Sequence, residues 1–112
     1  MLLKTALAIF LLAASSYPQS DSKSWHQVLE VKGSSTKQTD LFEIRGSKWR
    51  IRWQKPNADS SLYNYVYDKS GSPFDVVLAK GGADESYMHQ PGTFYMKIAA
   101  SDSYIITVED WR

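Results

Sequence analysis

The feature that most constrains this chain is a pair of alternating runs near its C-terminal end. In residues 92–98 and again in residues 103–109, every second side chain is apolar and those between are mostly polar. A period of two is the period of a half-buried β-strand. The short polar connection Ala100–Ser103 and the turn signal Pro91-Gly92 predict that the two strands form one hairpin.

A second pair of runs has the same character. Leu41–Arg45 alternates, Gly46-Ser47 is a turn signal, and Lys48–Gln54 alternates again, which predicts a second hairpin. In the returning run the tryptophans point one way and Arg50 and Arg52 the other. The side chains expected in the core of the domain, from both pairs of runs, are Trp49, Ile51, Trp53, Phe94, Met96, Ile98, Tyr104, Ile106 and Val108.

Three further segments complete the predicted set of strands. Trp25–Val31 fits helical spacing as well, but its shortness and the following Gly33 favour a strand. Leu62–Tyr67 and Phe74–Ala79 are rich in residues that favour strands. Ala83–Gln90 is polar and is predicted to be a loop. About seven short strands separated by turns predict an all-β, antiparallel β-sandwich, with a small barrel as the alternative.

The N-terminal segment has the pattern of a secretory signal peptide. Lys4 precedes the uncharged apolar run 6–14, and small residues follow it. The run is shorter than the roughly 20 apolar residues of a membrane-spanning helix, which makes a membrane anchor the weaker interpretation. We therefore expect a signal peptide over residues 1–16, with the cut at the latest near residue 20, one domain over residues 21–112, and a secreted or periplasmic location.

Composition excludes several classes of function. The chain has no cysteine, so disulfides, cysteine-based zinc sites and thiol redox chemistry are excluded. Its 13 Lys and Arg stand against 12 Asp and Glu, and Lys4 belongs to the predicted signal peptide, so the domain is balanced in charge. This balance argues against general nucleic-acid binding. No cofactor is expected.

The order of these patterns resembles that of the bacterial pre-peptidase C-terminal domain. The resemblance lies in Phe42-x-Ile44, Trp49-x-Ile51-x-Trp53, a tyrosine-rich strand that ends in Asp68-x-x-Gly71, and Pro91-Gly92-Thr93-Phe94-Tyr95 with its return strand, and it covers roughly residues 40–109. It implies a jelly-roll-like β-sandwich of the kind appended to secreted proteases and other exported enzymes. No full set of calcium ligands known from that family matches positions in this chain.

Two groups of residues are candidates for binding. Tyr63, Tyr65 and Tyr67 share one face of a strand and would form an aromatic platform for sugar rings or a protein partner, or else belong to the core. Which face of that strand is buried stays open, because the opposite face carries an asparagine. Arg50 and Arg52 would dock an anionic partner or a polysaccharide, or form a solvated row that discourages aggregation.

Catalytic and metal sites have weaker support. His26 and His89 are the two histidines, and neither stands in a pattern that specifies hydrolase chemistry. Asp68, Ser70 and Asp75, or Asp84 and Glu85, offer oxygen ligands without the spacing of a known calcium loop, and Asp68 fits a turn residue better. No catalytic residue and no metal ligand is therefore assigned.

The sequence thus predicts a secreted or periplasmic binding domain without enzymatic activity, which recognises a carbohydrate or a protein. The alternative is an accessory or inhibitor module of an exported enzyme, and a small hydrolase ranks below both. Tyr63, Tyr65 and Tyr67, together with Arg50 and Arg52 on a strand expected to be their neighbour, form the predicted binding surface.

Overall fold

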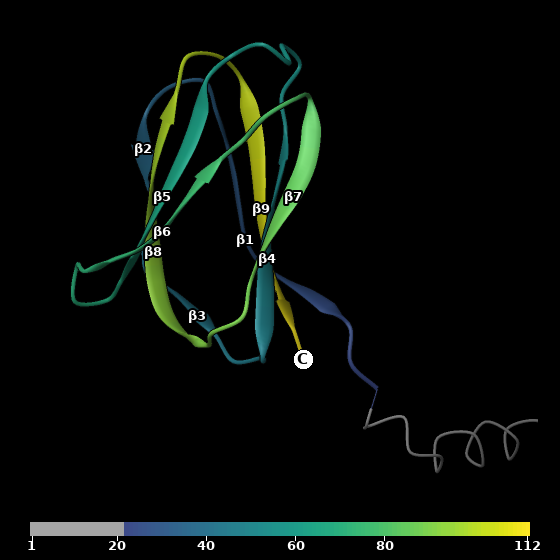
Figure 1. Ribbon diagram of the computed structural model, residues 1–112, viewed down its shortest axis with the longest axis vertical. Coiled ribbons are helices and arrows are strands. Elements are labelled where there is room, and N and C mark those ends of the chain that lie inside the picture. The colour runs from purple at the N-terminus through teal and green to yellow at the C-terminus, as the bar shows by residue number, and fades with distance from the viewer. Residues whose placement is uncertain (1–21) are drawn as a thin grey trace, which may run out of the picture.

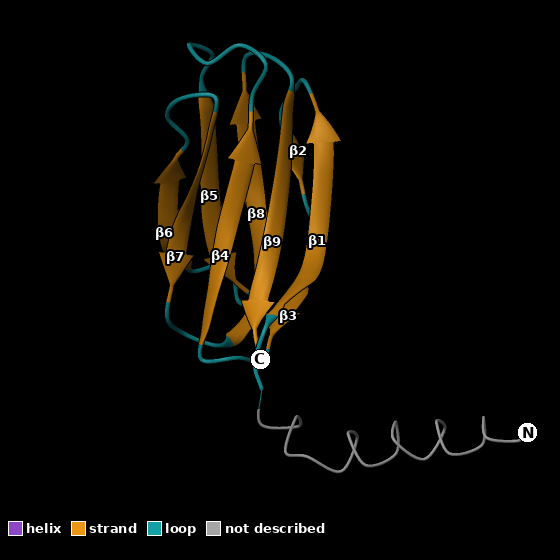
Figure 2. Cartoon of the chain, turned by 90° about the vertical axis from the view of Figure 1, so that its right-hand side faces the viewer, coloured by secondary structure: helices purple, strands orange, loops and turns teal. Residues whose placement is uncertain are grey.

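The computed structural model describes residues 22–112, which form nine β-strands (Figures 1 and 2). The predicted signal peptide lies outside the described residues. None of residues 22–112 forms a helix of the length and apolar character that a membrane crossing requires. The strands are β1 (Trp25–Gly33), β2 (Lys37–Gln38), β3 (Phe42–Ile44), β4 (Lys48–Gln54), β5 (Leu62–Asp68), β6 (Pro73–Leu78), β7 (Ala83–Met88), β8 (Gly92–Ala100) and β9 (Tyr104–Trp111).

The strands form two antiparallel sheets that pack face to face, as Figure 2 shows. One has the order β1-β9-β4-β7 and is called the β9 sheet below. The other has the order β2-β8-β5-β6, with β3 also paired to β8, and is called the β8 sheet. The predicted antiparallel β-sandwich is confirmed.

The topology is that of a jelly roll. Strands β2 and β3 pair with different parts of β8, so they are two pieces of one interrupted edge strand. With β2 and β3 counted together, the nine strands become eight, four in each sheet. Among consecutive strands only β5 and β6 then pair with each other, and every other connection crosses from one sheet to the other, as in a double-sheet jelly roll.

Both hairpins predicted from the sequence are therefore wrong. Strand β8 pairs with β2, β3 and β5, whereas β9 pairs with β1 and β4. Likewise β3 and β4 lie in different sheets. Two alternating strands joined by a short turn have the same sequence pattern whether they pair side by side or face each other across a core, and here they face each other.

The predicted core is correct despite this error, because inward alternation is common to both arrangements. All nine side chains expected in the core are buried, and Trp49, Ile51, Met96, Ile98, Ile106 and Val108 are completely so. Each large side chain removed from water stabilises the fold by about 1.5–3 kcal/mol. The two sheets are thus held together mainly by apolar packing between β4 and β9 on one side and β5 and β8 on the other.

The segment Ala83–Gln90, predicted to be a loop, contains strand β7. It pairs with β4 from Trp49↔Met88 to Gln54↔Ala83. Of its inward positions, those of Asp84, Ser86 and Met88, only Met88 is buried. A strand at the edge of a sheet has little core to cover, so its sequence lacks the apolar alternation that marks the other strands.

A buried carboxylate fastens the turn between β3 and β4 to β9. Asp110 is 1% exposed, and its two oxygens accept the backbone N–H groups of Arg45 and Gly46, each at 2.9 Å. A Cβ atom on Gly46 would lie 1.8 Å from the carbonyl oxygen of Trp111, so only glycine allows this approach. Asp110 continues the inward alternation of β9, and an acid at such a position was a sequence signal of a buried polar contact.

Candidate functional site

The structure shows which face of β5 is buried. Leu62, Asn64 and Val66 point into the core, and each is at most 1% exposed. Tyr63, Tyr65 and Tyr67 therefore point outward from the β8 sheet. The asparagine that left this choice open in the sequence is inside the core.

The tyrosines belong to a larger surface, built by strand pairing. Antiparallel register places Tyr63 beside Leu78 of β6 and Ala99 of β8, and Tyr65 beside Val76 and Lys97. Tyr67 lies beside Tyr95. We call this outer surface of the β8 sheet the tyrosine face, and its main residues are Tyr63, Tyr65, Tyr67, Val76, Leu78, Tyr95 and Lys97.

The rings on this face support one another. Tyr67 and Tyr95 are stacked, with centroids 5.2 Å apart and planes inclined by 18°. Tyr63 and Tyr65 meet edge to face at 6.2 Å. The ammonium group of Lys97 lies 5.4 Å from the centre of the Tyr67 ring. Such contacts hold the rings in fixed positions relative to one another.

The tyrosine face carries most of the large hydrophobic side chains that are exposed in the described part of the chain. Among residues 22–112, five large hydrophobic side chains are exposed, and three of them are on this face: Val76 at 57%, Leu78 at 47% and Tyr63 at 38%. A fourth, Leu41, directly precedes β3 at the edge of the same sheet. Soluble monomers seldom expose a contiguous apolar patch without a use for it.

Arg50 and Arg52 are not on this surface. They project from β4 in the β9 sheet, on the opposite outer side of the sandwich from β5. The expectation that the tyrosine strand and the basic strand would form one surface is therefore wrong. The consecutive strands β4 and β5 belong to different sheets in this topology, so nearness in sequence places their outward side chains on opposite sides of the sandwich.

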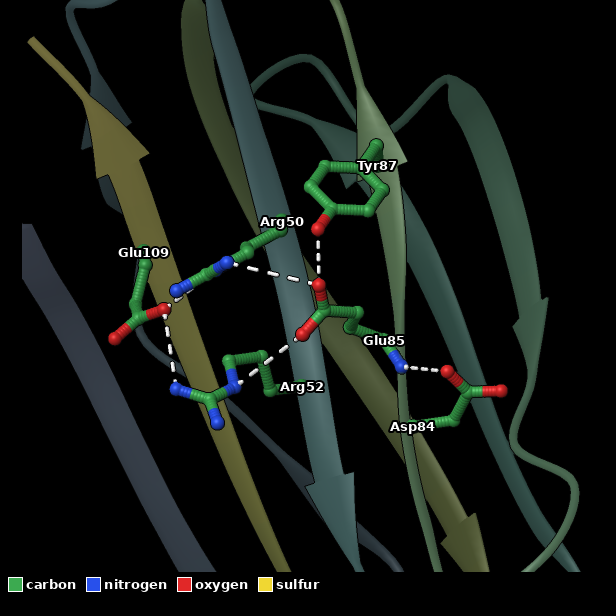
Figure 3. A network of polar contacts seen from close by, with 6 residues as sticks. All are labelled: Arg50, Arg52, Asp84, Glu85, Tyr87 and Glu109. Carbon is green, nitrogen blue, oxygen red and sulfur yellow. Dashed lines mark hydrogen bonds and ion pairs between the residues drawn. The ribbon is translucent and has the colours of Figure 1, made fainter. Parts of the chain in front are cut away.

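Both arginines are paired with acids of the strands beside them, as Figure 3 shows. The Arg50 Nε donates to Oε1 of Glu109 at 2.6 Å, and its Nη1 lies 3.6 Å from Glu85. Arg52 lies between the same two acids, 3.6 Å from each. The Tyr87 hydroxyl donates to Glu85.

This network changes the acid–base properties of Arg50. Burial lowers the pKa of its guanidinium, but hydrogen bonds to Glu109 and Tyr87 and the charges of Glu109 and Glu85 outweigh this effect, so its pKa is raised. The Arg50 side chain, only 14% exposed, also stacks over Trp25 at 4.0 Å. Arg50 is thus a structural cation, whereas Arg52, 48% exposed, remains accessible.

The residues considered from the sequence as metal ligands or as catalytic histidines include Asp68 and His26, and both make local contacts. The Asp68 carboxylate accepts the hydroxyl of Ser70 at 2.6 Å and the backbone N–H groups of Ser70 and Ser72, which closes the β5–β6 turn. These hydrogen bonds, that from the Ser70 hydroxyl first, hold its pKa below the usual value. Within residues 22–112, no three His, Asp or Glu side chains come together as a metal site would require. His26 contacts the carbonyl oxygen of Arg112 at 3.0 Å.

Sequence reasoning missed the partners that surround the tyrosines. Tyr95 and Lys97 alternate with the apolar side chains of residues 92–98, which predicts that they face outward, but nothing in the sequence links that strand to β5. Val76 and Leu78 were part of a predicted strand whose exposed face was not assigned. Only the order of strands in the β8 sheet brings these residues together.

Comparison with known proteins supports the fold and leaves function open. No protein-family model and no curated protein matches the chain, so the resemblance to pre-peptidase C-terminal domains stays a prediction. Among solved structures, the chain is similar to the crystal structure of SPBc2 prophage-derived protein YomS. The match has a TM-score of 0.54 at 8% sequence identity, and covers 81% of this chain and 94% of that one. At this identity the likeness concerns the fold alone.

Proposed function

We propose that this protein is an exported binding domain without enzymatic activity, and that the tyrosine face binds a protein partner. The observation that carries the proposal is the exposed apolar surface around Tyr63, Val76 and Leu78. Export is supported by the signal-peptide pattern of residues 1–16.

The composition of the face favours a protein over a carbohydrate. Centres of protein interfaces are rich in tyrosine and poor in charge. The two cross-strand rows through Tyr63 and Tyr65 contain Leu78, Ala99, Val76 and Lys97, of which Lys97 is the one charged residue. Sugars need polar groups beside the rings they stack on, whereas Tyr63 lies between Leu78 and Ala99, and Tyr65 has Val76 on one side. We therefore expect a partner with a flat apolar surface and a carboxylate placed to meet Lys97.

The test is capture from the envelope fraction of the producing cell, with variants on both faces. Val76→Lys and Leu78→Lys place a charge in the centre of the proposed interface, and Tyr65→Ala removes a ring from it. Each is expected to weaken capture of the partner about tenfold or more, as changes at interface centres do. Tyr87→Ala is the matched control, because Tyr87 is a 45% exposed aromatic on the opposite face.

The outcomes are distinct. Loss of a captured protein with the tyrosine-face variants, but not with Tyr87→Ala, supports the proposal, provided that thermal midpoints stay near that of the parent. Capture that is equal for all variants overturns it. Retention on an immobilised polysaccharide that depends on Tyr65 would also overturn it, in favour of a carbohydrate ligand.

A further inference from the structure

A second surface, on the β9 sheet, has the form of a ligand site. A groove of about 360 Å³ runs there, lined by residues of all four strands. Its polar lining includes Glu30, Lys32, Arg52, Gln54, Glu85 and Thr107, and Ile105 contributes an apolar part. We call it the β9 trough. Volumes of this order are typical of small-ligand sites.

Strand register explains why a trough forms here. In one cross-strand row Thr107 of β9 lies between Glu30 and Arg52, and in the next row Ile105 lies between Lys32 and Gln54. The β9 side chains in these rows are short, and their neighbours on β1 and β4 are long. The long side chains therefore form walls, and Ile105 and Thr107 form the floor.

The polar groups along the walls are only weakly engaged with one another. Arg52 approaches Glu85 and Glu109 at 3.6 Å, which is longer than a hydrogen bond, and Glu30 and Lys32 are 4.0 Å apart. The Glu30–Lys32 pair, exposed on both sides, contributes little to stability at this distance. Glu30, Lys32 and Arg52 therefore keep donors and acceptors for a ligand, whereas Glu85 already accepts the Tyr87 hydroxyl and Glu109 the Arg50 guanidinium.

The trough continues into a more apolar hollow. A second depression, of about 480 Å³, shares Gln54, Ala83 and Ile105 with the trough and extends to Pro56 and Tyr104 at the end of the sandwich. A ligand long enough to occupy both would meet polar side chains at one end and apolar surface at the other. This geometry suits a chain molecule that passes over the sheet rather than a small molecule enclosed by it.

We propose that the β9 trough binds a neutral oligosaccharide. Its charged lining comprises three acids, Glu30, Asp84 and Glu85, and two bases, Lys32 and Arg52, so it has no strong field to select an ionic ligand. Sugar hydroxyls both donate and accept, and the walls offer carboxylates, an amide and a guanidinium. The aliphatic floor matches the C–H face of a sugar ring. This proposal is independent of protein binding by the tyrosine face.

The probes are soluble neutral oligosaccharides of glucose, xylose, mannose and N-acetylglucosamine, titrated into the ¹⁵N-labelled domain. We expect one of them to shift the backbone resonances of Ile105, Thr107 and Arg52 and to leave those of Tyr63 and Tyr65 in place. Thr107→Trp, which fills the floor, should abolish the shifts, and Arg52→Ala should weaken binding about tenfold. Lys69→Ala, in the exposed turn between β5 and β6 of the other sheet, should leave the affinity unchanged.

Circular dichroism and the thermal midpoint show whether each variant is folded, and Gln54→Ala replaces any variant that is not. If no probe shifts trough resonances at millimolar concentration, the proposal is overturned. Shifts confined to the tyrosine face would also overturn it, and would at the same time place a sugar site where a protein is proposed. Unaltered affinity in both Thr107→Trp and Arg52→Ala would equally exclude the trough.

Discussion

At the scale of single residues, the buried polar side chains differ in how they are satisfied. The Lys55 ammonium donates to the carbonyl oxygens of Ser60 and Ala79 at 2.7 and 2.9 Å, and Asp110 accepts two backbone N–H groups. Asn64 is different, because it is 0% exposed and neither its Nδ2 nor its Oδ1 has a hydrogen-bond partner. A buried amide without partners costs about 1–3 kcal/mol.

Replacement of Asn64 by leucine keeps the number and branching of the side-chain heavy atoms and removes both unsatisfied groups, so it is expected to stabilise the domain by about 1–3 kcal/mol. Urea unfolding followed by tryptophan fluorescence measures this. Gln27→Leu, which replaces an exposed amide, is the control, and its free energy of unfolding is expected to change by no more than about 0.5 kcal/mol. A less stable Asn64→Leu protein would mean that the amide does contribute to the fold.

Asp68 gives the fold a dependence on pH. The pKa of its carboxyl is lowered in the folded state, so its ionised form stabilises the fold at neutral pH, and this contribution is lost as the pH falls through the folded pKa. We expect Asp68→Asn to lower the thermal midpoint at pH 7 and the difference from the parent to shrink below the ordinary aspartate pKa. A difference that is constant over pH would contradict this.

At the scale of elements, the sequence predicted strands better than it predicted their partners. Alternation at Trp49, Phe94 and Ile106 identified inward faces correctly, because burial of one face is a property of each strand alone. Pairing depends on the direction of the chain after a turn. A short polar turn such as Ala100–Ser103 can connect two strands of one hairpin, or two strands that lie in different sheets. The partners of Arg50 and the neighbours of Tyr65 were for this reason unpredictable.

One edge strand of each sheet, β6 and β7, carries an aspartate in a similar position. Asp75 on β6 and Asp84 on β7 both occupy inward register positions, opposite Val66 and Trp53. Each carboxylate accepts the N–H of the next residue, at 2.7 Å for Val76 and 2.8 Å for Glu85. Both aspartates are exposed, and a charge at such a position on an edge strand hinders the addition of another strand.

Asp75→Val should therefore convert β6 into an aggregation-prone edge, with an uncharged run from Phe74 to Leu78. Size-exclusion chromatography coupled to light scattering is expected to show oligomers whose share increases with the protein concentration. Asp59→Val, in an exposed loop, should remain like the parent. A monomeric Asp75→Val protein would show that the edge is protected in another way.

At the scale of the whole molecule, the jelly roll joins segments that are far apart in the chain. Trp25 at the start of β1 pairs with Trp111 at the end of β9, and Lys37 pairs with Ile98. The central strand of the β9 sheet thus comes from the last residues of the sequence. Contacts between distant segments slow folding, since the intervening chain must be ordered first.

We accordingly expect refolding to take milliseconds to seconds, as in other β-sandwiches. Stopped-flow dilution from urea, followed by the fluorescence of the four tryptophans, measures the rate. Refolding within microseconds would mean that much of the structure forms locally, against the strand order seen here.

The two outer surfaces of the sandwich point in opposite directions, and this has a thermodynamic consequence. A protein seated on Tyr65 and a glycan lying over Thr107 would be separated by the full thickness of the core, so neither would touch the other. Their binding free energies would then add without a coupling term. The domain would join the two into a ternary assembly by tethering alone, and saturation with one would leave the affinity for the other unaltered.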